Sequence, residues 1–412
     1  MPGDATWEVG TLTVPSSPGT VSVTGMPSQP KAVFFFGANW TAEDTVIAGA
    51  TGHALFRGMV APDYANPGSL LQNAACAGPT GDQHWIDNYA ILNLTTAGSA
   101  TLLYRASLTS LDADGFTVDF DTAVSGGYKV IYVALMDVDN IGAFVGASSQ
   151  SALAYGFTAG ASLLHGAWAG PVASGSDRTQ EWYGGAAYGV NQGAGVHVFT
   201  FPTSFQGQYN IGTSAFAPNV SVCQGGSFVG PFLSASNIIT GVSGTDLSFT
   251  GDGSNGGMIV AWDDNDSATG EFSIGAAVDD TASVTGLPFA PGLVIGYSAS
   301  NEPPGQGTGA RGALGFSVIT PDFQWSALVE SYFPGYTTFG TGRGSIQSYA
   351  NGIIPAIDDT AYCAASVELT DDGFVATTTV DDIGTGAWVW HAFGFPKKGG
   401  WVPQIYRRVI PG

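Results

Sequence analysis

The sequence predicts an all-β protein of three tandem antiparallel β-sandwich domains, jelly-roll-like and about 130 residues each. Three observations support this fold class. The same landmarks recur three times in the same order, and the apolar segments are short and alternate with polar residues. Helix signals are scarce in a chain that has 60 glycines among 412 residues. Internal repeats of this size define the architecture before any single motif does.

The clearest repeat joins residues 23–38 to residues 284–299. Aligned without a gap, the two segments share Val, Thr, Gly, two prolines, a later Val and the final Ala. Their offset is 261 residues (284 minus 23), which is twice about 130. A third copy is therefore expected between them, and the middle of the chain holds one that is degenerate at its start, over 153–168.

A second landmark combines a turn with a strand. Residues 110–116 (Ser-Leu-Asp-Ala-Asp-Gly-Phe) return as 368–374 (Glu-Leu-Thr-Asp-Asp-Gly-Phe), with a weaker middle copy at 242–249. An apolar run follows each copy; the runs are 129–136, 258–262 and 387–393. Units of about 130 residues are large enough to be domains, whereas solenoid repeats have roughly 20–50 residues.

These landmarks divide the chain into five parts. We expect an N-terminal segment at 1–19, repeat 1 at 20–140, a divergent repeat 2 at 141–278, repeat 3 at 279–396 and a C-terminal tail at 397–412. No long low-complexity linker separates the repeats, so the domains are expected to abut.

The apolar segments inside each repeat have the period of half-buried strands. Phe116, Val118 and Phe120 alternate with Thr117 and Asp119. Segments of the same kind are 33–36 and 130–133. Asp-Gly pairs at 114–115 and 372–373 and the Gly-Gly pair at 126–127 indicate tight turns, because glycine tolerates positive φ.

The composition argues against two classes of partner. Only 11% of residues are charged, and the net charge of −22 opposes sequence-independent binding to nucleic acid. No run approaches the ~20 apolar residues of a membrane span. The first residues, 1–6, lack the basic start and apolar core of a signal peptide. We therefore expect a protein used in a cytoplasm, or assembled there and released by lysis.

The cysteines and histidines carry no recognisable chemistry. Cys76, Cys223 and Cys363 are not equivalent between repeats and form no CxxC pair, which predicts reduced core residues without a disulfide scaffold or zinc site. None of the five histidines forms an HxH or HExxH pattern, and no P-loop, dinucleotide fingerprint or G-x-S-x-G elbow is present. The sequence therefore predicts a protein that is not an enzyme and needs no cofactor.

Carboxylates cluster where repeats 1 and 2 end. The acidic residues of these two joints are Asp137, Asp139, Asp263, Asp264 and Asp266. Two interpretations remain open: Ca²⁺ sites that stiffen the joints between domains, or Asp/Asn-rich turns that leave a strand. Repeat 3 has Phe-Gly-Phe-Pro at 393–396 in this place, and no fourth repeat follows it.

The tail combines basic and aromatic residues, unlike the acidic chain before it. Its candidate assembly residues are Lys397, Lys398, Trp401, Tyr406, Arg407 and Arg408. Such a segment suits docking onto an acidic neighbour, for example another copy of the chain, or folding back onto its own acidic domain.

The repeat pattern resembles β-sandwich repeats in structural proteins of tailed bacteriophages. Three elements carry the resemblance: the opening at 23–33, the Leu-Asp-Ala-Asp-Gly-Phe turn at 111–116 and the closing strand at 128–136. The resemblance implies a virion location, partners among copies of itself and other virion proteins, and no catalytic residues.

Three function classes follow. The first is a non-enzymatic virion subunit, associated with the tail, tail tip or fibre, with a capsid decoration or head-spike protein as the alternative. The second is a glycan-binding array in which Trp residues such as Trp40, Trp85 and Trp325 stack on host polysaccharide, although core packing explains most of them. The weakest is a polysaccharide hydrolase with paired carboxylates, because no spacing singles out a pair.

Overall fold

The fold is given by a computed structural model, which describes most of the first and third repeats and the strands of the second. The described residues are 6–48, 53–77, 84–96, 99–138, 140–145, 150–154, 160–169, 180–189, 195–202, 215–217, 221–224, 234–243, 246–250, 256–263, 266–299, 310–333, 341–358, 361–381 and 387–395. Within these ranges the chain is all-β, its 31 strands pair antiparallel and no helix is present. The predicted all-β class is confirmed.

The strands fall into three sets, which we call units 1, 2 and 3. Unit 1 contains β1 (Thr6–Thr13), β2 (Gly19–Thr24), β3 (Ala32–Ala38), β4 (Ile47–Ala48), β5 (Leu55–Pro62), β6 (Leu70–Ala77), β7 (His84–Asp87), β8 (Ile91–Thr96), β9 (Ser99–Asp112), β10 (Gly115–Thr122) and β11 (Lys129–Met136). Unit 2 contains β12 (Ile141–Val145), β13 (Gln150–Ala154), β14 (Gly160–Ala169), β15 (Gln180–Gly189), β16 (Gly195–Pro202), β17 (Ala215–Ala217), β18 (Ser221–Gln224), β19 (Ser234–Ser243), β20 (Asp246–Thr250) and β21 (Gly256–Asp263). Unit 3 contains β22 (Ser267–Ser273), β23 (Thr281–Val284), β24 (Ala290–Ala299), β25 (Ala310–Thr320), β26 (Phe323–Phe333), β27 (Thr341–Ser348), β28 (Ile353–Asp358), β29 (Ala361–Thr370), β30 (Gly373–Asp381) and β31 (Ala387–Phe395).

The three units have the same order of strand pairing. In the described residues the large sheets are β1-β11-β3-β5-β6-β7, β12-β21-β14-β15-β16-β17 and β22-β31-β24-β25-β26-β27-β4. The small sheets are β2-β10-β9-β8, β13-β20-β19-β18 and β23-β30-β29-β28. When β4 is set aside, every strand of one unit has a counterpart in the other two. Unit 2 therefore follows the common pattern, even where its sequence is degenerate.

The pairing also shows where each unit begins. β1 lies within the expected N-terminal segment, yet it pairs along its whole length with β11, the last strand of unit 1. β22 begins at Ser267, inside the stretch expected to close repeat 2, and pairs with β31 of unit 3. Each unit thus starts with an edge strand that precedes the first sequence landmark. The landmark Val-Thr-Gly lies where the second strand of its unit ends: β2 ends at Thr24 and β23 ends at Val284.

In units 1 and 3, where the side chains are described, the large sheets are buried on both faces, which explains their nearly continuous apolar sequences. On β3, Val33 and Phe35 pack toward the small sheet of unit 1, in a core that includes Phe116 of β10. Phe34 and Phe36 point to the opposite face. This alternation follows from the period of two of a strand. Unit 3 has the same two-sided β-sandwich-like arrangement, with Trp388, Trp390 and Ala392 in the inner core and Phe393 on the opposite face.

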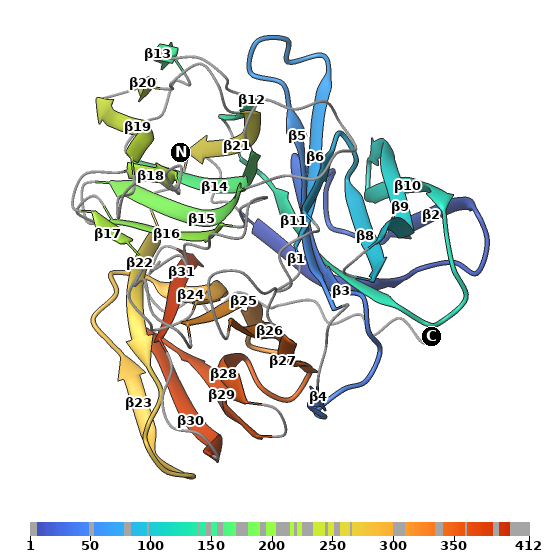
Figure 1. Ribbon diagram of the computed structural model, residues 1–412. Helices are drawn as coiled ribbons and strands as arrows, with labels where there is room; N and C mark the ends of the chain where they lie inside the picture. Colours follow the sequence, from blue (N-terminus) through green and yellow to red (C-terminus); the bar gives the residue numbers. More distant parts are fainter. Residues whose placement is uncertain are drawn as a thin grey trace.

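Each large sheet has one face that points away from its small sheet, and these three faces meet in one shared core. Phe34 of unit 1, Trp262 of unit 2 and Ile295 of unit 3 all belong to it. Strands touch around the whole circuit: β5 contacts β12, β15 contacts β22, and β26 contacts β5. Figure 1 shows the result as three lobes around a centre, coloured blue to teal, green to yellow, and orange to red. The small share of charged residues in the chain agrees with this arrangement, because apolar sheet faces are buried between its own units.

No helix in the described part of the chain has the length and hydropathy needed to cross a bilayer.

Candidate functional site

Among the described residues, the most elaborate contact between units lies where the first unit meets the last. After β3 the chain of unit 1 runs across to unit 3, and we call residues 40–48 the strap. At its end, β4 pairs with the edge strand β27 through Ala48 opposite Gly344 and Ile47 opposite Ser345. Figure 1 shows blue β4 beside orange β27. The strap adds one further strand to the large sheet of unit 3.

Backbone and side-chain hydrogen bonds hold the strap to β27. The N–H of Asp44 donates to the carbonyl of Gln347 over 2.8 Å, and the Gln347 side-chain Nε2 donates to the carbonyl of Trp40 over 2.9 Å. Gln347 is buried, so its amide would leave an unmade hydrogen bond without the strap, at a cost of ~1–3 kcal/mol. The strap is therefore an integrated part of the unit 3 edge.

His53 makes a second contact between the same two units. Its ring stacks on Trp40, with centroids 5.1 Å apart and an interplanar angle of 12°. Its Nδ1 is hydrogen-bonded to the Ser345 hydroxyl of β27. Burial lowers the pKa of His53 from 6.5 to about 4. His53 is therefore neutral at neutral pH, and it links β5 of unit 1 to the strand on which β4 docks.

A charged pair and an aromatic ring close the outer edge of this contact. Lys129 Nζ lies 3.0 Å from Glu43 Oε1 and 4.7 Å from the ring centroid of Tyr349. Both partners of the ion pair are more than two-fifths exposed, so solvent screens it and its contribution is small. Burial, together with the charge of Glu43, raises the pKa of Tyr349.

The inner side of the same contact buries a guanidinium between aromatic rings. Arg57 of β5 is 1% exposed, and its guanidinium carbon lies 5.5 Å from the ring centroids of both Phe36 and Tyr297. Tyr297 belongs to unit 3, so the cation bridges two units. Burial raises the pKa of Tyr297, and the positive charge of Arg57 opposes the rise. We refer to the strap, His53, Arg57 and their unit 3 partners as the closing seam.

At the centre of the molecule, one aromatic ring from each unit meets the other two. Trp7 lies 5.6 Å from Trp262 and 5.0 Å from Phe393, and Trp262 lies 5.7 Å from Phe393, all between ring centroids. Trp262 and Phe393 are equivalent positions on β21 and β31; the counterpart in unit 1 is Leu135, which pairs with Trp7. The closing runs of repeats 2 and 3 and the first strand of unit 1 therefore supply the central contact.

The first candidate metal joint is a hydrogen-bonded turn in its described part. Asp137 has a positive φ of 54° and accepts hydrogen bonds from Thr6 Oγ1 (2.8 Å) and Ser28 Oγ (3.0 Å). Both carboxylate oxygens thus bind hydroxyls that hold the start of β1 and the loop before β3. Among the described residues no group of three or more His, Cys, Asp or Glu could hold a metal ion.

The other candidate site residues are placed only in part or not at all. Asp139 and Asp264 lie outside the described residues, and Asp263 ends β21 with its side chain undescribed. Asp266 precedes β22, and its carbonyl accepts the N–H of Gly394 over 2.7 Å. The assembly tail lies wholly outside the described residues: Lys397, Lys398, Trp401, Tyr406, Arg407 and Arg408. The joint-calcium and tail interpretations therefore stay predictions.

The tryptophans whose side chains are described lie in the core, apart from the half-buried Trp7. The fully or almost fully buried rings are Trp40, Trp262, Trp325, Trp388 and Trp390. A ring that is at most 6% exposed presents no face for a sugar to stack on. Trp85 and the remaining tryptophans lie where no side chain is described. In the described part, the aromatic residues serve packing within and between units.

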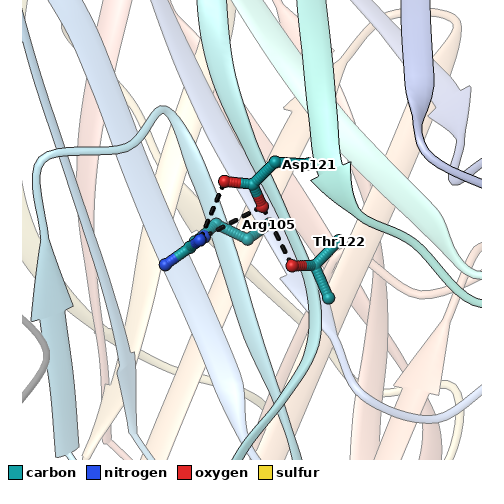
Figure 2. A network of polar contacts seen from close by, with 3 residues as sticks. All are labelled: Arg105, Asp121 and Thr122. Atoms are coloured by element: carbon teal, nitrogen blue, oxygen red, sulfur yellow. Dashed lines mark hydrogen bonds and ion pairs between the residues drawn. The ribbon is translucent and has the colours of Figure 1, made fainter.

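An exposed polar network lies on the small sheet of unit 1 (Figure 2). Arg105 of β9 binds both carboxylate oxygens of Asp121, from Nε over 3.0 Å and from Nη2 over 2.8 Å, and Thr122 donates to the same carboxylate. Burial raises the pKa of Asp121, but the hydrogen bonds from Arg105 and Thr122 and the Arg105 charge hold it below its usual value. The ring of Tyr89 lies against the Arg105 guanidinium, with its centroid 4.1 Å from the guanidinium carbon. This network joins neighbouring strands and lies away from the closing seam.

Sequence reasoning missed the closing seam. The strap has no counterpart among the landmarks, and its docking strand is about three hundred residues away in the chain. The only signal in the sequence is the apolar pair Val46-Ile47 inside an otherwise polar connection between two apolar strands. Neither Arg57 nor His53 belongs to a motif.

Comparisons with known proteins add no relative: no family model, curated protein or solved structure matches the chain.

Proposed function

We propose that the chain is made of three tandem antiparallel β-sandwich domains, jelly-roll-like, that form a single-chain pseudo-trimer. The common pairing order of the three units is the observation that carries this proposal. The shared core and the contacts around the whole circuit support a closed ring of domains over a rod, because a rod would leave units 1 and 3 apart.

We further propose that this pseudo-trimer is a non-enzymatic structural subunit of a bacteriophage particle. The resemblance of the repeats to structural proteins of tailed bacteriophages supports it, as does an architecture in which a shared core and the closing seam hold the units together. Its partners are then copies of itself and other virion proteins, and its location is the virion. Contact with a host-surface glycan is compatible with such a place, although no described residue singles out a sugar site.

The three-lobed arrangement favours a position on a local three-fold axis of the particle. Three equivalent domains around a centre can present similar surfaces to three neighbours related by a local three-fold axis. A capsid decoration or head-spike protein occupies such an axis, and so can a subunit at the end of a tail. The shaft of a fibre suits the arrangement less, because it needs units stacked end to end.

Two measurements test the proposal. Multi-angle light scattering of the purified chain, away from the particle in which it meets its partners, should give the mass of one 42.1 kDa chain, because its large-sheet faces already cover one another. An antibody against the chain should then label density-banded phage particles from the source lysate, and image averaging should place the label. Particles free of the chain, from a lysate that contains it, would contradict the virion role. The pseudo-trimer would be contradicted separately if the chain proved to assemble through its large-sheet faces.

A further inference from the structure

The closing seam contains one imidazole, His53, the type of side chain whose charge changes nearest to neutral pH. Units 1 and 2 are joined covalently, as are units 2 and 3, but units 1 and 3 meet only through noncovalent contacts. In the described residues these contacts include those of the strap, His53 and Arg57, beside the contact of Trp7 with Phe393 at the centre. Opening this seam would release the strap contacts between units 1 and 3 without breaking a covalent bond and would leave the central contact of Trp7 with Phe393 in place.

We propose that His53 is an acid-sensitive latch, whose protonation releases the strap from β27 and so loosens the contact between units 1 and 3. The inference does not depend on where the protein sits in a particle. It rests on three contacts: the stack on Trp40 at the start of the strap, the hydrogen bond to Ser345, and the pairing of that same Ser345 with Ile47 of β4.

The position of His53 explains how one proton can act on the whole strap. Ser345 is 0% exposed, and it joins His53 and β4 at a single residue of β27. Two residues further along, Gln347 holds the other end of the strap by bonding Trp40 and Asp44. A charged imidazolium in this buried place would need water, which it reaches only if the strap moves away.

Among the side chains that the structure describes, no charged or titratable group around the seam offers the imidazolium a close counter-ion. Glu43 and Asp44 lie on the strap itself, and Glu43 is bound to Lys129 of β11. Arg57 of β5 is cationic and lies against Tyr297 of β24, while Tyr349 follows β27. The lowered pKa of His53 has burial as its cause, without a charge contribution from any of these groups. Protonation therefore disfavours the closed state.

Hydrogen exchange measured by mass spectrometry tests the latch on the full chain. The strap peptide should open about tenfold to a hundredfold more often at pH 4.5 than at pH 7.5, after correction for intrinsic exchange, because the open state binds the proton more tightly. The β9–β10 hairpin, which lies outside the seam, should show no such increase. A flat profile for the strap peptide over this pH range would overturn the proposal.

Two variants separate the histidine from the neighbouring ion pair. His53→Gln keeps a hydrogen-bonding side chain but cannot be protonated, so its strap should exchange equally at both pH values. Glu43→Gln removes the ion pair with Lys129 and should keep the acid response of the wild type. If Glu43→Gln loses the response, or His53→Gln retains it, the latch is not His53.

A direct titration covers the case in which His53→Gln fails to fold. Nuclear magnetic resonance of the wild-type chain with labelled histidine gives the pKa of each of the five imidazoles. A resonance assigned to His53 by its through-space contact with the Trp40 ring, and titrating below about pH 5, supports the latch. Titration of every histidine near the usual value of about 6.5 would overturn it.

Discussion

The backbone N–H of Gly25 donates a hydrogen bond to the Asp114 carboxylate over 3.2 Å, and the same bond joins Gly286 to Asp372 over 3.3 Å in unit 3. Both glycines have a positive φ, 91° and 82°. The carbonyls of Asp114 and Asp372 accept the next backbone N–H in each unit, over 2.9 Å. The two sequence landmarks, Val-Thr-Gly and Asp-Gly-Phe, are thus bonded to each other, which gives a physical reason for their joint recurrence.

The glycines of the Asp-Gly-Phe landmark should not tolerate a side chain. A Cβ on Gly115 would lie 1.8 Å from the Val23 carbonyl oxygen, and a Cβ on Gly373 would lie equally close to that of Val284. Because the obstacle is backbone, strands must shift, and each Gly→Ala change should cost about 3 kcal/mol of unfolding free energy. Urea denaturation followed by circular dichroism measures this.

Gly68→Ala is the matched control for that measurement. A Cβ there meets nothing nearer than Asn66 Oδ1 at 3.9 Å, in an exposed turn, so the change should stay within ~0.5 kcal/mol. If Gly115→Ala is as mild as this control, the close approach of the two strands is not as described.

The Asp side chains of the same landmark should contribute independently to the free energy of unfolding, one in unit 1 and one in unit 3. Asp114→Ala and Asp372→Ala each remove a hydrogen bond at an exposed turn and should each cost ~1 kcal/mol. Because the two turns belong to different units, the double variant should lose the sum of the two. Unfolding midpoints of the three variants check this; strong non-additivity would mean that the turns are coupled through the shared core.

Much of the architecture could be predicted because it follows from local patterns. The alternation of Phe116, Val118 and Phe120 with polar residues indicates β10, and the two-sided apolar sequence of β3 indicates a strand buried on both faces. The repeat spacing indicates three units. No pattern, however, says what covers the second face of β3, because sandwich cores and interfaces between units use the same residue types.

The candidate site was predictable only in part, for reasons that the contacts make plain. Acidic residues at a joint are common to calcium sites and turns, and only the hydroxyls of Thr6 and Ser28 show how Asp137 is satisfied. The strap depends on pairing between Ile47 and Ser345, which no local signal encodes. A two-residue strand is too short to have a periodicity.

The central ring contact should couple the three units during unfolding. Trp262 is fully buried against Trp7 and Phe393, so Trp262→Ala should cost about 3–5 kcal/mol and broaden the transition, since it removes packing shared by all units. Trp388→Ala makes a comparable cavity inside unit 3 alone and serves as the control. Calorimetry should resolve separate transitions only for Trp262→Ala; a single sharp transition in both variants would argue against this coupling.

Chelation gives a test of the joint-calcium interpretation. The carboxylate of Asp137 already accepts hydrogen bonds from two hydroxyls, so we expect no metal ion at this joint. EDTA should therefore leave the melting temperature of the protein unchanged. Asp137→Asn should in turn lower stability by ~1 kcal/mol whether or not EDTA is present. A melting temperature that falls with EDTA and returns with added Ca²⁺ would instead support metal at the joints.

Alkaline pH should destabilise the fold through its buried tyrosines, of which Tyr132 is the clearest. Its ring lies edge-on to Phe116, at 5.3 Å between centroids, in the core of unit 1. Burial, with a smaller contribution from the Glu8 charge, raises the pKa of Tyr132 from 10.0 to about 12. Between these values the unfolded chain has lost the proton and the folded chain has kept it, so stability falls as the pH rises through this window. Two pKa units correspond to at most about 3 kcal/mol for this residue.

Tyr132→Phe should therefore flatten the decline in unfolding free energy that urea denaturation measures between pH 9 and about pH 12. Tyr64→Phe, in the half-exposed turn after β5, should follow the wild type. Equal declines in all three proteins would place the alkaline sensitivity in the other buried tyrosines, whose pKa values burial also raises: Tyr104, Tyr297 and Tyr349.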